Sequence, residues 1–351
     1  AQCGAGLAAC SGMASEVVAW APDIVDGRVV PTHVARPGWV RVGEALAPVG
    51  SRLFGRRHFR DGVDRPLCRA VHGAAARGAL FGFAPPPHFT RVATGRGRRP
   101  IDVYRGRAPL VNGLAAAGEC VLHHHRGGGT RGTLVVVNRG TGLLADVIAR
   151  RFAVALVAAG FDVAISVVAD RDDREWARSV GQALATIVRR VHHGVAVEAW
   201  ARAAGYRTVM ATGIGIGGTV TALLASTTSR FDGCVPILAG THPGRLWLAP
   251  RALARAADHA ALARDEVRQP RTLLRLFEPV APGRLPAPRR REGSAVVGFR
   301  YDAQVPPADV QALGDHWRIR PVWLERSHVE LPASARTLAT VVAHAAAAID
   351  T

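Results

Sequence analysis

The chain has 351 residues, of which 48% are hydrophobic and 21% charged, a composition typical of a globular protein and not of a disordered one. Its formal net charge of +18 rests on 45 basic residues that are all Arg, which favours the coding bias of a GC-rich genome over a polyanion partner. The Arg clusters lack regularly interleaved aromatic residues, so nucleic acid is not the expected partner, while an anionic membrane surface stays open.

The cysteine pattern, the length of the apolar runs and the first residues bear on metal binding and on location. Five scattered cysteines form no CxxC pair, so neither a disulfide framework nor a zinc site is expected. No apolar run reaches the length of a membrane span. Leu7 to Cys10 resembles a bacterial lipobox but follows only six residues, so a cytoplasmic location is expected, with envelope attachment as the alternative.

Residues 1–130 show little hydrophobic periodicity and are rich in Gly, Pro and Arg. They are expected to form an irregular, partly helical N-terminal region that precedes or wraps a core domain. The polar segment 123–129 (HHHRGGG) is interpreted as a flexible boundary. Because the side chains of adjacent histidines diverge, no metal site is expected there.

From Thr133 onward, strand-like and helix-like patterns alternate. Continuous apolar runs predict six strands, at 134–137, 163–168, 208–211, 234–238, 295–299 and 321–324. Helical spacing predicts helices at 146–159, 175–204 and 219–225 and from about 334 to the end. Since the strands are apolar on both faces, residues 131–351 are predicted to form a mostly parallel sheet with helices on both faces. A basic, Pro-broken helical segment at about 242–293 is interpreted as a lid.

The third of these strands runs into a glycine-rich turn, Gly213 to Gly218, which a helix follows. Gly213, Gly215 and Gly218 match the dinucleotide fingerprint GxGxxG, which would make the chain a dinucleotide-binding protein. That fingerprint normally has an acidic residue at the end of the next strand. Here the nearest acid, Asp232, precedes that strand, so no cofactor is expected and the dinucleotide function is kept as an alternative.

The same turn matches the nucleophile elbow GxSxG, with Gly215 where the serine would stand. An elbow of this kind requires an acid and a histidine after later strands, and Asp302 and His328 follow the predicted strands at 295–299 and 321–324. Oxyanion donors are expected from the backbone N–H of Ile216 and from the earlier loop near Thr141. The predicted catalytic positions are therefore Gly215, Asp302 and His328.

Other interpretations of these residues stay open at this point. Asp302 is also suited to cap the turn before Val305, and His328 to be a hydrogen-bonded loop histidine. Asp309 and Glu325 are rival acids.

Several segments together resemble the alpha/beta hydrolase domain-containing protein 18 family. Residues 200–206 (WARAAGY), leading into 213–218 (GIGIGG), are similar to that family's tryptophan-bearing helix, G-Y pair and G-x-S-x-G-G elbow. Residues 140–142 (GTG) resemble its G-T-G loop, and 305–317 followed by Ser327-His328 its closing segment. The resemblance implies an α/β-hydrolase fold with a Ser-Asp-His triad acting on esters or lipids. The chain departs from it at Gly215, where the serine is replaced.

A glycine at this position would keep the turn and delete the attacking hydroxyl. The leading hypothesis is an ester or lipid hydrolase homologue with impaired or lost catalysis, a pseudoenzyme or a slow hydrolase, whose partner is a small ester or acyl ligand. An active hydrolase with a non-standard nucleophile is the alternative, besides the dinucleotide-binding protein. The sequence gives no indication of the oligomeric state.

Overall fold

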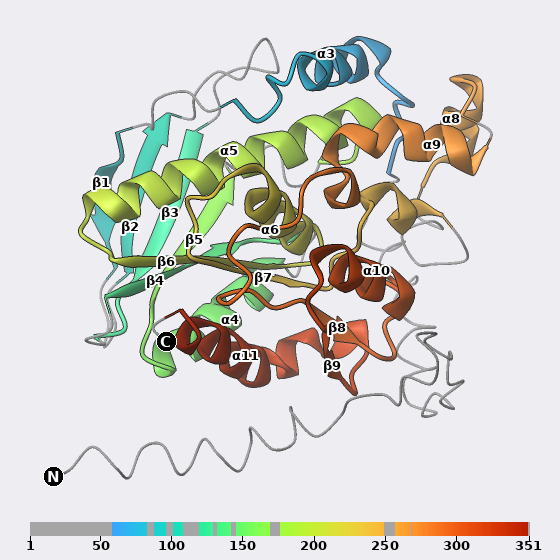
Figure 1. Cartoon of the computed structure of the whole chain (residues 1–351). Helices are drawn as coiled ribbons and strands as arrows, with labels where there is room; N and C mark the ends of the chain where they lie inside the picture. Colours follow the sequence, from blue (N-terminus) through green and yellow to red (C-terminus); the bar gives the residue numbers. More distant parts are fainter. Residues whose placement is uncertain are drawn as a thin grey trace, which may run out of the picture.

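The structure is a computed structural model that describes residues 58–82, 88–95, 101–107, 119–128, 132–141, 145–168, 176–248, 257–267 and 269–349 (Figure 1). The lipobox-like segment at Leu7 to Cys10 and the last glycine of the 140–142 loop lie outside these residues. No helix within the described ranges is long and apolar enough to cross a membrane.

In the described residues, nine strands form one sheet in the order β1-β2-β3-β5-β4-β6-β7-β8-β9. The strands are β1 (Thr90–Thr94), β2 (Ile101–Arg107), β3 (Glu119–His125), β4 (Thr133–Asn138), β5 (Asp162–Val168), β6 (Thr208–Ile214), β7 (Gly233–Ile237), β8 (Val297–Phe299) and β9 (Val322–Leu324). The pairs from β5 through β4 to β9 are parallel, while β1, β2 and β3 pair antiparallel at one edge.

The larger helices are α3 (Arg65–Ala76), α4 (Ala145–Ala158), α5 (Val180–Ala203), α6 (Ile216–Thr227), α10 (Pro307–Trp317) and α11 (Ala335–Ala347). Helices α5 and α6 contact each other on one face of the sheet, and α4 and α11 contact each other on the other (Figure 1). Strand β4 between these layers is buried along its whole length, as the apolar run from Leu134 predicts. The prediction of a mostly parallel sheet covered by helices on both faces is therefore confirmed.

A helical insertion follows β7 and precedes β8. Its described parts are η1 (Pro243–Trp247), α8 (His259–Arg264), α9 (Pro270–Phe277), η2 (Glu278–Val280) and η3 (Pro282–Arg284). Rings from separate segments pack together here: Trp247 stacks on Phe277 with centroids 4.9 Å apart and lies 5.0 Å from Phe59. This aromatic packing fixes the insertion to the body of the domain.

The prediction of an irregular, partly helical region is wrong for β1, β2 and β3, which are three strands of the sheet. The histidine run expected as a flexible boundary is the end of β3 and pairs with β5. His124 faces inward, is buried, and its Nε2 lies 2.9 Å from the hydroxyl of Tyr206. Because a histidine occupies an inward position, the sequence of this strand lacks the alternation of apolar and polar residues by which antiparallel strands are recognised.

The chain order of the parallel strands creates a switch point. From β4 the chain moves to β5 on one side, and then crosses to β6 on the other side of β4. The loops that leave β4 and β6 therefore diverge at the carboxyl edge of the sheet, which is where open α/β sheets bind ligands.

Candidate active site

The turn between β6 and α6 is sharp and has Gly215 at its apex. Gly215 has φ 60° and ψ −117° and is the N-cap residue of α6. Its N–H donates to the carbonyl of Ile237 (3.0 Å), and its own carbonyl accepts from the N–H of Thr219 (2.9 Å). A Cβ built at this position would meet no atom within 4 Å. The position of the missing side chain thus faces open space in a backbone conformation that strains any other residue.

The neighbouring glycines are required for a different reason, close contact between backbones. A Cβ at Gly217 would lie 2.0 Å from the carbonyl oxygen of Asn138, and one at Gly213 would lie 2.4 Å from the carbonyl oxygen of Gly217. At Gly218 the obstacle is the carbonyl oxygen of Ile237, 2.4 Å away. The start of α6 therefore packs directly against the ends of β4 and β7. Of the four glycines in the motif, Gly215 alone has room for a side chain.

Asp302 and His328 are brought together by the turns after β8 and β9. Nδ1 of His328 lies 2.9 Å from Oδ2 of Asp302, whose carboxylate is buried. The other oxygen, Oδ1, accepts the backbone N–H groups of Gln304 (2.7 Å) and Val305 (2.8 Å). Asp302 therefore both caps its turn and orients the imidazole, so the two interpretations of this residue are compatible.

His328 is the first residue of η4 (His328–Ala333), and a capping box stabilises the start of this short helix. The backbone N–H and the hydroxyl of Ser327 both donate to Oε2 of Glu330 (2.7 and 3.0 Å). The His328 side chain is 26% exposed, and among the described residues its Nε2 has no hydrogen-bond partner. Burial lowers the pKa of His328, but the charge and hydrogen bond of Asp302 outweigh it, so that the pKa lies above its ordinary value.

The rival acids are engaged elsewhere. Oδ1 of Asp309 pairs with Nη1 of Arg245 at 2.9 Å, and Oε1 of Glu325 pairs with Nε of Arg300 at 2.8 Å. Within the described part of the chain, neither carboxylate hydrogen-bonds His328. Of the three acids, Asp302 is the one placed to orient the histidine.

Both predicted oxyanion donors lie beside the turn. Ile216 is the first residue of α6, so its N–H has no acceptor within the helix. Thr141 is half-buried in the loop after β4. The preceding Gly140 approaches the end of β6, because a Cβ there would lie 3.2 Å from the carbonyl oxygen of Ile214. Nδ2 of Asn138 donates to Oγ1 of Thr221 (3.0 Å), which ties this loop to α6.

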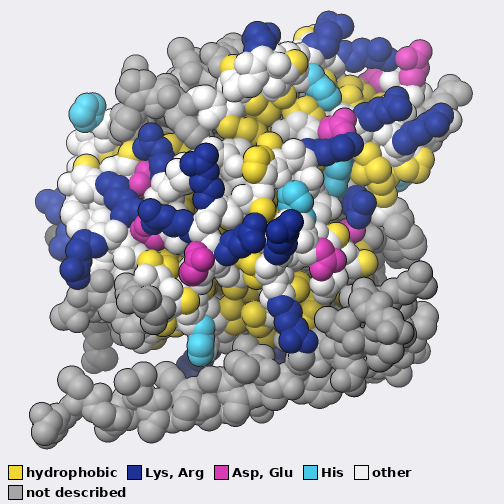
Figure 2. Space-filling model, in the orientation of Figure 1, with side chains coloured by type: hydrophobic (Ala, Val, Ile, Leu, Met, Phe, Trp, Pro, Cys, Tyr) yellow, Lys and Arg dark blue, Asp and Glu magenta, His cyan; other side chains and the backbone are white. Residues whose placement is uncertain are grey.

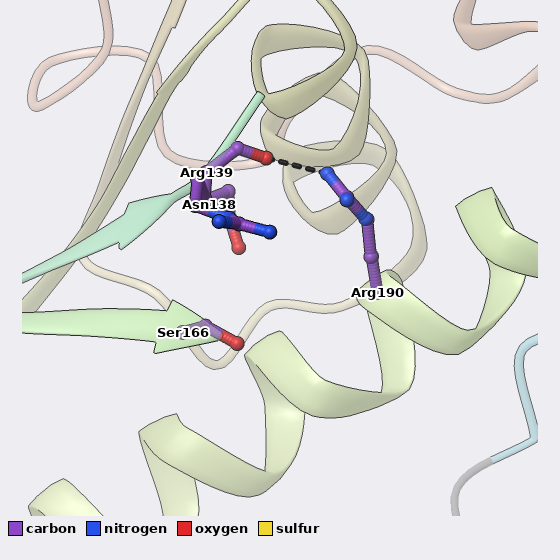
Figure 3. Close-up of a pocket in the computed structure, with 4 residues that line it drawn as sticks. All are labelled: Asn138, Arg139, Ser166 and Arg190. Atoms are coloured by element: carbon purple, nitrogen blue, oxygen red, sulfur yellow. Dashed lines mark hydrogen bonds between the residues drawn. The ribbon is translucent and has the colours of Figure 1, made fainter. Parts of the chain in front are cut away.

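A small pocket opens where this loop leaves β4 (Figure 3). It is lined by Asn138, Arg139, Ser166 and Arg190. Arg190 extends from α5, and its Nη1 donates to the carbonyl oxygens of Arg139 (2.6 Å) and Gly140 (3.1 Å). Arg190 is not among the residues that the sequence predicts for the site. The available indication was its place as a charged residue within a long, mostly apolar helix. An Arg that is buried in such a helix needs a specific partner.

The geometry argues against the dinucleotide alternative. Oδ2 of Asp232 accepts from Nη2 of Arg202 (2.7 Å) and from the N–H of Val209 near the start of β6 (2.8 Å). Asp232 thus lies at the amino ends of β6 and β7, whereas the glycine turn lies at their carboxyl ends. A ribose-binding acid would have to be at the same edge as the turn.

The described residues also include no group of three or more His, Cys, Asp or Glu able to hold a metal ion.

Solved structures resemble this fold at low sequence identity. Acetyl xylan esterase 1 from Thermoanaerobacterium sp. JW/SL YS485 has a TM-score of 0.51 at 13% identity, covering 82% of this chain and 96% of that one. Brefeldin A esterase, a bacterial homologue of human hormone sensitive lipase, has a TM-score of 0.47 at 16% identity, with 88% and 92% covered. No family model matches the chain, and no curated protein matches it in sequence. The strand order, the sharp turn after β6 and the likeness to the first of these esterases show that the chain has the α/β-hydrolase fold.

Proposed function

We propose that this protein binds a small ester or acyl ligand at the carboxyl edge of its sheet and that its hydrolysis of such a ligand is impaired or lost. The observation that carries the proposal is the apex of the turn after β6. Gly215 has the strained backbone conformation of a nucleophile elbow and open space where a side chain would project, but it supplies no hydroxyl.

The ester class is supported by the remaining groups. His328 and Asp302 have the contact expected of a base and its orienting acid, and Ile216 offers an unused N–H at the start of α6. The first of the similar solved structures is by name an esterase, which agrees with an ester ligand.

Without a nucleophile, residual hydrolysis has to use water. In that route neutral His328 takes a proton from a water molecule whose oxygen attacks the ester carbonyl carbon, and then gives the proton to the departing alcohol oxygen. Active sites that lose one triad member keep roughly 10³–10⁴-fold catalysis over water, far below the intact set. The proposed activity of the natural chain is therefore weak.

The helical insertion between β7 and β8 is proposed to act as a lid. It begins where β7 ends, at the same edge of the sheet as the turn at Gly215. Within it, the N–H of Gly283 donates to the carbonyl of Thr241 (2.9 Å), and η3 contacts both α6 and α10. These contacts hold the insertion beside the candidate site.

Nucleic acid is not part of the proposal, in spite of the net charge. On the face shown in Figure 2, Arg side chains are spread over many elements, with Asp and Glu side chains between them. Some of the Arg residues have structural partners, such as the pairs of Arg202 and Arg290 with Asp232. Basic side chains that are dispersed, with acidic side chains between them, are typical of a solvated surface and not of a phosphate-tracking groove.

The test restores the missing group. We expect Gly215→Ser to hydrolyse p-nitrophenyl acetate at least about a hundredfold faster than Gly215→Ala, because only the serine variant adds a hydroxyl. The alanine variant is the matched control, since it carries the same backbone strain.

Adding His328→Ala or Asp302→Asn to Gly215→Ser should remove most of the gain. Equal rates for the serine and alanine variants, both folded by circular dichroism, would overturn the proposed function.

A further inference from the structure

Arg190 occupies an unusual place for a charged residue. It lies in the middle of α5, a 24-residue helix most of whose residues are buried, and is itself 5% exposed. From there it reaches the loop that leaves β4, where its Nη1 donates to the carbonyl oxygen of Arg139 (Figure 3). The same nitrogen also donates to the carbonyl oxygen of the next residue, Gly140. Burying a guanidinium is costly unless it makes specific hydrogen bonds, so this pair of contacts is the feature to explain.

Holding two successive carbonyls fixes the orientation of the peptide units that contain them. The described residues include no cis peptide bond, and in a trans peptide the C=O and the N–H point in opposite directions. The carbonyls of Arg139 and Gly140 point to Arg190, so the N–H groups of Gly140 and Thr141 point away from it. The loop lies against the elbow on the Gly140 side, next to the carbonyl of Ile214.

We propose that Arg190 is a positioning residue that orients the peptide N–H of Thr141 as an oxyanion donor by holding the carbonyl oxygens of Arg139 and Gly140. The inference rests on the proposed function, because it assumes that this loop is the oxyanion loop. Without these contacts the two peptide units are free to rotate and to turn a carbonyl toward the developing negative charge, which would repel it.

An arginine suits this role better than other donors. Its planar guanidinium presents several N–H groups in a fixed arrangement and stays charged at any pH at which the protein is folded. Lysine at the same position would place a compact ammonium on a differently shaped stem and hold the two carbonyls less well. Glutamine keeps a donor but is shorter and uncharged, so it should fail to reach them.

The first experiment uses the chain with Gly215 in place and needs no catalysis. Amide hydrogen exchange is measured at residues 139–141 in the natural chain, Arg190→Lys and Arg190→Gln, relative to exchange in β4 of the same sample. We expect exchange of the loop amides to rise by at least about tenfold in Arg190→Gln and by less in Arg190→Lys. Arg189→Gln is the matched control, because Nη2 of Arg189 donates to Oγ1 of Thr186 within α5.

Unchanged loop exchange in Arg190→Gln would overturn the inference, as would an equal rise in Arg189→Gln. If Arg190→Gln does not fold, Arg190→Lys decides by the same criterion, with a rise over the natural chain expected.

The second experiment separates positioning from general support of the fold. In the Gly215→Ser background, Arg190→Gln should lower kcat for p-nitrophenyl acetate by about 10- to 100-fold with little change in KM, and Arg190→Lys should recover part of the loss. A raised KM with unchanged kcat would contradict a role in the transition state. If Gly215→Ser itself is inactive, the proposed function fails, while hydrogen exchange still decides whether Arg190 holds the loop.

Discussion

At the scale of single residues, the contact between His328 and Asp302 makes a prediction that is independent of catalysis. The pKa of His328 lies above its ordinary value of 6.5 because the charge and hydrogen bond of Asp302 outweigh the effect of burial. In Asp302→Asn the burial remains and the charge is gone, so the pKa of His328 should fall below 6.5. Titration of the His328 ring protons by NMR measures both values.

The raised pKa also sets how the stability of the fold depends on pH. A histidine with a higher pKa in the folded than in the unfolded state binds its proton more tightly when folded. Its contribution is therefore complete below pH 6.5 and is lost as the pH rises through the folded-state pKa. Asp302→Asn should remove this stabilisation. An unchanged His328 pKa in that variant would mean that the 2.9 Å contact is not formed in solution.

At the scale of elements, the glycine motif joins α6 to two strands and predicts an order of stabilities. Gly215→Ala should cost about 1–3 kcal/mol through backbone strain alone, since its Cβ meets no atom within 4 Å. Gly217→Ala should cost more, because its Cβ would lie 2.0 Å from the carbonyl oxygen of Asn138 and force α6 away from β4. Urea unfolding of the two variants measures both losses. The reverse order would show that α6 does not pack this closely on β4.

The sequence indicated that the insertion between β7 and β8 is helical, but it did not indicate how the insertion packs. The basic, Pro-broken stretch is predicted to be helical, and its described parts include η1, α8 and α9. The cluster that fixes them combines Trp247, Phe277 and Phe59, which are far apart in the chain. No local pattern shows that such residues will meet.

At the scale of the whole molecule, the sequence predicts the parallel half of the sheet well and the antiparallel edge poorly. Most of the parallel strands are buried on both faces and so read as continuous apolar runs, as β4 does, although the edge strand β9 is only partly buried. The edge strand β1 is exposed at all five of its positions, and β3 carries His124 at a buried position. Apolar periodicity cannot reveal strands of that kind.

The candidate site also contains residues that the sequence predicts and one that it does not. Gly215, Asp302 and His328 were predicted because each follows a recognisable parallel strand, and the structure brings the last two into contact. Their roles remain predictions. Arg190 was not predicted, because its partners are backbone carbonyls about 50 residues away, and side-chain patterns do not show where carbonyls point.

The most direct measurement is covalent labelling with a fluorophosphonate, located by mass spectrometry. If the turn after β6 is a nucleophile elbow that lacks only its hydroxyl, Gly215→Ser should carry the adduct on the peptide that contains position 215, and the natural chain should stay unlabelled. A labelled Ser or Thr in the natural chain would contradict this account and favour an active hydrolase with another nucleophile. A folded Gly215→Ser variant without any adduct would contradict the elbow itself.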